Sequence, residues 1–237
     1  GAVRDRAEAE AILCFESEAK LLSLLAGQSA PRLLSRGADA HGPWLHTEKL
    51  AFDTLATRIE KGNVALRDKG WLKKAVTSAM TALAGLHEAV DGHGALGIVH
   101  ADISPANVAI ADDGAVTVFL DFELACWRES PTRDGAFRGT IAYAAPEVAR
   151  GEKPTVQSDL FALAATMLHA VTGVAPRQGE SFAAMLAEAA EVPIAESAKA
   201  ALVSVGLDAL SRCLAHEAAE RPSSAREAVK MVSGSPA

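Results

Sequence analysis

The segment that most constrains the fold is the run HADISPANVAIADDGAVTVFLDFE at residues 100–123, which combines polar side chains with a hairpin pattern. Asp102 and Asn107 lie in a loop that enters a short predicted strand, and Asp121 ends the next predicted strand. The turn sequence Asp-Asp-Gly at 112–114 predicts a hairpin, because glycine accommodates a positive φ at that position. The hairpin would bring both strand ends, and with them the three polar side chains, to one site.

These three side chains suit phosphoryl transfer. Carboxylate and amide oxygens are hard ligands, which suit Mg²⁺ together with substrate phosphates. Phosphoryl transfer needs a metal that neutralises phosphate charge and a carboxylate that positions the attacking hydroxyl. The segment therefore favours a metal-dependent phosphotransferase centred on Asp102, Asn107 and Asp121.

Two motifs in this segment, HAD-ISPA-N and DFE, resemble those of the protein-kinase superfamily, of the bacterial Ser/Thr kinase type. That family has His-Arg-Asp with an Asn five residues later, followed by Asp-Phe-Gly. The resemblance continues through GT at 139–140, APE at 145–147 and SDLFALA, which contains Asp159. It implies an α+β, protein-kinase-like two-lobe fold with a truncated small lobe of one helix and short strands. We expect this partial small lobe at 1–50 and a mainly helical large lobe at 51–237.

The resemblance assigns roles to the three polar residues. By that resemblance, Asp102 is the catalytic base that accepts the proton of the substrate hydroxyl. Asn107, also a catalytic-loop residue, and Asp121 are the implied Mg²⁺ ligands. ATP and Mg²⁺ are the implied cofactors.

Four residues are implied to bind the cofactor. Glu18, in the run FESEAKLLSLL, resembles the glutamate of the small-lobe regulatory helix that pairs with a lysine. The segment WLHTEKL resembles the last small-lobe strand and the hinge. This places Thr47 at the gatekeeper position, with Glu48 to Leu50 offering backbone groups to adenine.

The beginning of the family pattern is absent from this chain. No Gly-rich loop precedes Glu18, and the small-lobe lysine is missing, because Arg4 and Arg6 are the only basic residues upstream. The resemblance therefore implies that the N-terminal part of the small lobe is missing.

Three internal positions also depart from the pattern. Ala101 replaces the arginine that reads a phosphorylated activation segment, so we expect no control by such phosphorylation. Ser104 stands where serine/threonine kinases carry a second lysine near the γ-phosphate. Glu123 replaces a glycine and removes backbone freedom at that position.

The expected function is ATP- and Mg²⁺-dependent phosphorylation of Ser or Thr hydroxyls in a protein or peptide. The loop and DFE together are similar to those in the kinase domains of class III/IV lanthipeptide synthetases, which makes a lanthipeptide precursor a candidate substrate. The alternative is a catalytically impaired pseudokinase that acts as a binding or regulatory module, favoured by the missing lysine and by Ser104. A small-molecule kinase of the aminoglycoside or choline type is less favoured, because those enzymes lack the APE motif.

Composition limits the classes of binding partner and the cellular compartment that we expect for this chain. The chain has 23 Lys and Arg against 30 Asp and Glu, a net charge of −7, which argues against nucleic acid as a partner. We also expect neither a signal peptide nor a membrane span, because no apolar run approaches about 18 residues. Cys14, Cys126 and Cys213 are widely spaced, which predicts reduced thiols in a cytoplasmic protein. Flanking domains in a larger protein are expected.

Hydrophobic periodicity outlines the remaining elements. Apolar residues return to one helical face over 8–26 and 71–90, which predicts two helices. Residues 31–50 predict two strands joined by a turn, and GIVH at 97–100 predicts another short strand. The second half predicts a helical bundle in which 197–215 is one helical run.

The resemblance also implies two structural contacts. His100 would pack with Phe122 and Leu22, in a structural role rather than as an acid or base. Glu147 and Arg221 would form a buried ion pair that supports the fold.

Overall fold

The computed structural model describes residues 2–131 and 137–234, with side chains described from residue 11 onward. Its α-helices are α1 Ala2–Leu25, α2 Leu55–Glu60, α3 Lys69–His87, α4 Pro146–Ala149, α5 Val156–Thr172, α6 Phe182–Glu191, α7 Glu196–Ser204, α8 Ala209–Cys213 and α9 Ala225–Ser233. Single 3₁₀ turns are η1 Val64–Arg67, η2 Pro105–Asn107, η3 Ile141–Tyr143 and η4 Ala218–Glu220.

The described strands are short, and each forms a sheet with the strand next to it in sequence; Ala109 of β5 also forms an isolated bridge with Thr54. They are β1 Leu33–Asp39, β2 Gly42–Thr47, β3 Val90–Asp91, β4 Gly94–Ala95, β5 Val108–Ile110 and β6 Thr117–Phe119. Each consecutive pair, β1 with β2, β3 with β4 and β5 with β6, forms an antiparallel two-stranded sheet. This mixture of helices and short antiparallel strands confirms the predicted α+β class.

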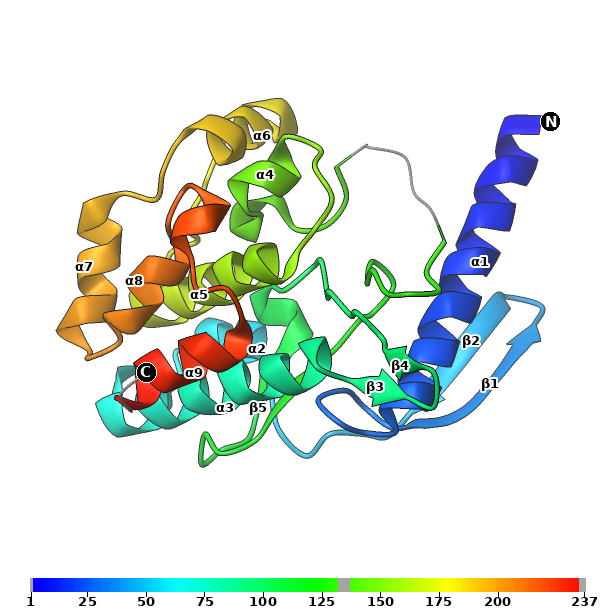
Figure 1. Ribbon diagram of the computed structural model, residues 1–237, viewed down its shortest axis with the longest axis horizontal. Coiled ribbons are helices and arrows are strands. Elements are labelled where there is room, and N and C mark those ends of the chain that lie inside the picture. Colours follow the sequence, from blue (N-terminus) through cyan, green and yellow to red (C-terminus); the bar gives the residue numbers. More distant parts are fainter. Residues whose placement is uncertain (1, 132–136, 235–237) are drawn as a thin grey trace.

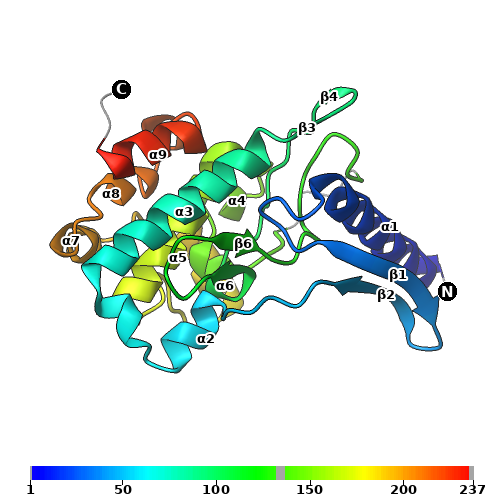
Figure 2. The same ribbon diagram turned by 90° about the horizontal axis from the view of Figure 1, so that it is seen from below.

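The helix α1 and the β1–β2 hairpin lie together at one end of the molecule, and the remaining helices form the other end (Figures 1 and 2). These elements confirm the helix predicted at 8–26 and the hairpin predicted at 31–50. Gly37 of β1 allows the hairpin to close, since a Cβ there would lie 2.5 Å from the ring of Trp44. Leu21, Leu22 and Leu25 bury one side of α1 in the main core.

The helix α5 lies at the centre of the helical end, and most of its side chains are buried. Thr155 and Ser158 begin it with a reciprocal capping box, in which each side chain accepts the other's backbone N–H. Gly173 ends it in the left-handed conformation, at φ 73°. The helix α3, predicted at 71–90, packs against both α5 and α9.

Three details differ from the sequence expectation. The GIVH segment at 97–100 is not a strand but forms a single bridge between Val99 and Cys126. The run 197–215 is not one helix, because the chain turns at Gly206, φ 79°, and divides it into α7 and α8. The hairpin β3–β4 was not predicted, since two-residue strands leave no periodic pattern.

None of the described helices is both long enough and apolar enough to cross a membrane.

Candidate active site

The β5–β6 hairpin places two of the predicted site residues at the same end. Val108 pairs with Phe119, and the backbone N–H of Leu120 donates to the carbonyl of Asn107 at 2.9 Å. Asn107 therefore lies opposite the residue that precedes Asp121. The predicted hairpin is confirmed, together with the convergence of its strand ends.

Asp102 is held from two sides. The Asn107 amide Nδ2 donates to the Asp102 carbonyl at 3.0 Å and to its Oδ2 at 3.2 Å. On the other side, the backbone N–H of Thr140 donates to Asp102 Oδ1 at 2.8 Å. Gly139 permits this approach, because a Cβ there would lie 3.1 Å from Asp102 Oδ1 and its φ is 106°. The segment that precedes Ala145-Pro146-Glu147 is thus attached directly to the predicted base.

A buried carboxylate shapes the loop that carries Asp102. Asp159, in the first turn of α5, accepts the backbone N–H of His100 at 2.7 Å and that of Ala101 at 2.9 Å. His87 Nε2 lies 2.9 Å from the same side chain. Ala101 adopts φ 68°, a left-handed conformation that costs about 1–2 kcal/mol for a residue with a Cβ. The two amide bonds to Asp159 offset that cost.

His100 supports the site from beneath. Its ring is buried, packs 4.8 Å from the ring of Phe122, and places Nε2 3.0 Å from the Leu120 carbonyl. Burial lowers the pKa of His100, so the ring is neutral and Nε2 donates that bond. The predicted contact with Phe122 is confirmed. Leu22 is buried and borders the same pocket as Phe122.

Asp121 has a strained backbone that its neighbours stabilise. Its φ is 61°, and its Oδ1 accepts the backbone N–H of Glu123 at 3.2 Å. The next residue, Phe122, donates its backbone N–H to Glu18 Oε1 at 3.1 Å. The structure therefore brings Glu18 of α1 to this site, where its hydrogen-bond partner is a backbone amide.

A pocket of about 400 Å³ lies between α1, β2 and the segment that contains Asp121. Glu18, Thr47 and Asp121 line it, so three of the predicted site residues share one cavity of ligand size. Glu48 and Leu50 follow along the chain and are not among the lining residues. Thr47, the predicted gatekeeper, thus lies at the pocket, whereas the two predicted hinge residues do not line it.

The donor set fits a hard divalent cation. Asn107 uses its Nδ2 for Asp102, which leaves its amide oxygen to serve as a ligand. Asp121 Oδ1 accepts the Glu123 amide, and its Oδ2 could serve as a second ligand. Oxygen ligands from an amide and a carboxylate suit Mg²⁺ bound together with phosphates. The adjoining pocket of about 400 Å³ is of ligand size.

The charged form of Glu18 destabilises the folded state. Burial raises its pKa above 4.5, and the negative charges of Asp121 and Glu123 act in the same direction. The folded state therefore binds a proton more readily than the unfolded state, and this contribution to stability is lost as the pH rises above 4.5.

Replacing Glu18 with glutamine should raise the free energy of unfolding at pH 7 by about 1 kcal/mol. Glutamine still accepts the Phe122 N–H and carries no charge to desolvate. Urea denaturation would measure the gain, which should shrink toward pH 4, where the parent glutamate is protonated. Glu16→Gln, on the exposed side of α1, is the matched control. A gain that grows toward acid pH would contradict this account.

The predicted ion pair between Glu147 and Arg221 is present and buried. Arg221 Nη1 lies 2.6 Å from Glu147 Oε1, and Nη2 lies 2.9 Å from Oε2. The guanidinium also donates to backbone carbonyls and lies 4.9 Å from the centre of the Phe161 ring. This bidentate pair joins the segment after Thr140 to the C-terminal helices.

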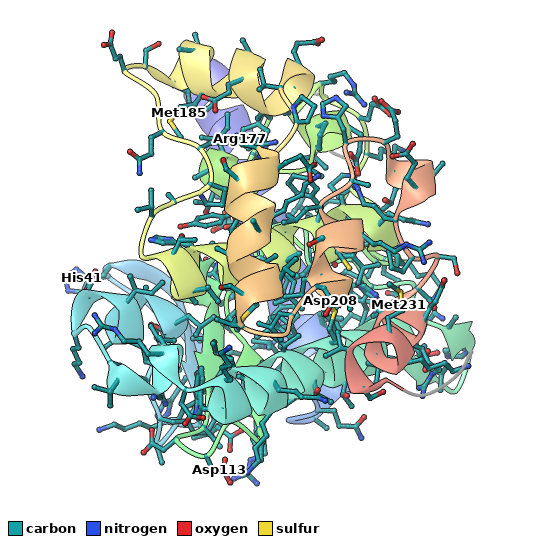
Figure 3. The ribbon with its side chains drawn as sticks, turned by 90° about the vertical axis from the view of Figure 1, so that its left-hand side faces the viewer. His41, Asp113, Arg177, Met185, Asp208 and Met231 are labelled. Carbon is teal, nitrogen blue, oxygen red and sulfur yellow. The ribbon has the colours of Figure 1, made fainter. Side chains whose placement is uncertain are left out.

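The sequence reading missed Arg177, which follows α5. It is 2% exposed, lies 5.3 Å from the Phe161 ring centre and donates to the Ala144 carbonyl at 2.9 Å. Burial lowers its pKa to about 10. Figure 3 shows it close to α6, where it also donates to the Ala189 carbonyl. A single arginine in a loop carries no sequence sign of burial.

Trp127 was also missed. It is 6% exposed, and its Nε1 donates to Ser17 Oγ of α1 at 2.9 Å. Trp127 and Ser17 lie 110 residues apart in the sequence, so no local sequence pattern indicates their contact.

Comparison with known proteins identifies relatives for most of the chain. The Protein kinase domain family model matches residues 6–232. The chain is 32% identical over 226 residues to mitogen-activated protein kinase kinase kinase 18 of Arabidopsis thaliana, covering 87% of this chain. It is 37% identical over 128 residues, 53% of the chain, to the DNA damage-responsive serine/threonine-protein kinase RqkA of Deinococcus radiodurans. It is 34% identical over 137 residues, 56% of the chain, to the serine/threonine-protein kinase PknK of Mycobacterium tuberculosis.

These matches cover 62%, 18% and 12% of the three relatives' own lengths, respectively. The family match spans both the α1–hairpin end and the helical end, and it includes the loop, the hairpin and the Glu147–Arg221 pair described above. The chain therefore belongs to the protein kinase domain family.

Proposed function

We propose that the chain transfers the γ-phosphoryl group of ATP, in an Mg²⁺-dependent reaction, to Ser or Thr hydroxyls of a protein or peptide. The observation that carries the proposal is the Asp102 carboxylate, which the Thr140 amide and Asn107 hold beside the hairpin end that bears Asp121. Serine/threonine-protein kinases among the relatives support a hydroxyl acceptor.

Each site residue has a distinct task in this proposal. Asp102 accepts the proton of the acceptor hydroxyl, and the Thr140 amide keeps its carboxylate oriented. Asn107 and Asp121 would hold Mg²⁺ through the side-chain oxygens that these hydrogen bonds leave available. When bound, ATP supplies the phosphoryl group and the cation neutralises its charge.

Calorimetric titration with ATP, with and without Mg²⁺, tests the cofactor part of this proposal. The parent chain should bind ATP in an Mg²⁺-dependent manner, and Asp121→Ala should weaken binding at least about tenfold, since it removes a charged ligand. Asp208→Ala, an exposed carboxylate of the α7–α8 turn (Figure 3), is the matched control and should bind as the parent does. Equal binding by the parent and Asp121→Ala would reject the site.

A second candidate function is a pseudokinase that binds nucleotide as a regulatory module. It is favoured by the surroundings of Glu18, where the charged groups that shift its pKa are both carboxylates, and by the buried Ser104 in the catalytic loop. Nucleotide binding without any phosphate transfer above that of Asp102→Asn would favour this alternative.

The substrate and the cellular setting are parts of the same proposal. A lanthipeptide precursor is the specific substrate that the HAD-ISPA-N and DFE motifs suggest. Phosphorylation of a Ser- and Thr-rich precursor peptide, compared with a general protein substrate, would test that choice. We further propose that the chain acts in the cytoplasm, within a larger protein that carries flanking domains.

A further inference from the structure

The position of Asp121 depends on α1. A non-glycine residue at φ 61° is maintained only where its surroundings fix it. The bond from the Phe122 amide to Glu18 is one of those constraints, and Glu18 belongs to α1. Any rotation or shift of α1 would therefore release the backbone next to Asp121.

Besides the buried leucines, one polar contact holds α1 beside Glu18, and it comes from Trp127. Its indole Nε1 donates to the hydroxyl of Ser17, the residue before Glu18, at 2.9 Å. Lys20, one helical turn further on, lies 6.0 Å from the centre of the Trp127 ring and pairs with Glu129. The ion pair is exposed on both sides and so contributes little, whereas the indole is buried.

Backbone hydrogen bonds hold the residues on both sides of Trp127. Cys126 and Val99 exchange backbone hydrogen bonds, both of 2.8 Å, and Arg128 donates its backbone N–H to the Leu96 carbonyl at 2.8 Å. Trp127 thus lies between two residues bonded to the strand-like segment that leads into His100. The Trp127 side chain therefore connects the backbone segment that precedes Asp102 to α1.

We propose that Trp127 is a positioning residue for Asp121. Through Ser17 it sets the rotation of α1, which keeps Glu18 on the Phe122 amide and Asp121 in its left-handed conformation. The link from Trp127 to Ser17 uses neutral groups, so it needs no phosphorylated residue to hold α1 in place. This inference rests on the proposed function, because that function gives Asp121 its role as a metal ligand.

Two variants remove the two ends of the hydrogen bond. Trp127→Phe keeps an aromatic ring but loses the donor, and Ser17→Ala loses the acceptor with little change in volume. We expect each to speed hydrogen exchange at the Phe122 amide, and to weaken Mg²⁺-dependent ATP binding, about fivefold to tenfold. The double variant should change neither quantity further, since both substitutions break one interaction. Glu129→Gln removes the exposed ion pairs of Glu129 with Lys20 and Arg128 but keeps the indole hydrogen bond, and it should stay within about twofold.

The readouts separate positioning from stability. Unchanged Phe122 exchange in Ser17→Ala would overturn the proposal, as would effects of the two single variants that add. A uniform rise in exchange at all core amides would also overturn it, because that result marks a general loss of stability. If the parent chain transfers no phosphate, the proposed function fails, while Phe122 exchange still tests the role of Trp127.

Discussion

Replacing Asp102 with asparagine is expected to lower phosphate transfer to a Ser or Thr substrate about a thousandfold while leaving the fold intact. The carbonyl oxygen of an asparagine side chain still accepts the Thr140 N–H, and Asn107 Nδ2 keeps its bond to the backbone carbonyl of residue 102. Only the bond from Asn107 to Oδ2 is lost, so the loop keeps most of its support. The amide cannot take a proton from the acceptor hydroxyl. Transfer of labelled phosphate under single-turnover conditions, with thermal unfolding measured alongside, would show the loss of chemistry without loss of fold.

Asp113→Asn is the matched control for this experiment. It makes the same chemical change at an exposed carboxylate in the turn of the same hairpin (Figure 3). Its transfer rate should stay within about twofold of the parent. Undiminished transfer by Asp102→Asn would show that this carboxylate is not the base.

Arg221→Ala is expected to produce the largest loss of stability. It would leave the Glu147 carboxylate buried and unpaired, which costs about 3–5 kcal/mol. It also removes the donors to the carbonyls of Ala215 and His216. For a chain of this size the melting temperature should fall by about 10 °C. Calorimetry or circular dichroism would measure it.

The exposed pair between Arg226 and Glu88 provides the comparison. It joins the same two residue types, but the two side chains are 64% and 44% exposed. Arg226→Ala should lower the free energy of unfolding far less than Arg221→Ala, because water screens such exposed pairs. If Arg221→Ala melted no lower than Arg226→Ala, the ion pair would have no special role in the fold.

Sequence reasoning predicted the centre of the site better than its surroundings. The Asp-Gly turn sets the register of β5 and β6, and that register brings Asn107 next to the residue before Asp121. A local turn sequence is therefore sufficient to predict that Asn107 and Asp121 lie at the same end of the hairpin. The Glu147–Arg221 ion pair could be predicted for a different reason, because the resemblance to the protein-kinase family implies it.

The surroundings could not be predicted because they depend on backbone positions and long-range packing. The partner of Glu18 is the amide of Phe122, and an amide has no signature in the sequence. Trp127 meets Ser17 across more than a hundred residues, and Arg177 is buried by helices that lie on both sides of it. Such contacts become visible only when the elements are assembled.

The hold of Asp159 on the catalytic loop has an evolutionary consequence. The shape of the backbone at Ala101 is imposed from α5 by hydrogen bonds to main-chain amides, and these bonds are indifferent to the side chain at that position. A lineage can therefore exchange the side chain at 101 without moving the backbone that leads to Asp102, the proposed base. Substitutions at 101 and at 102 are therefore separate mutational steps, and selection can act on either one alone.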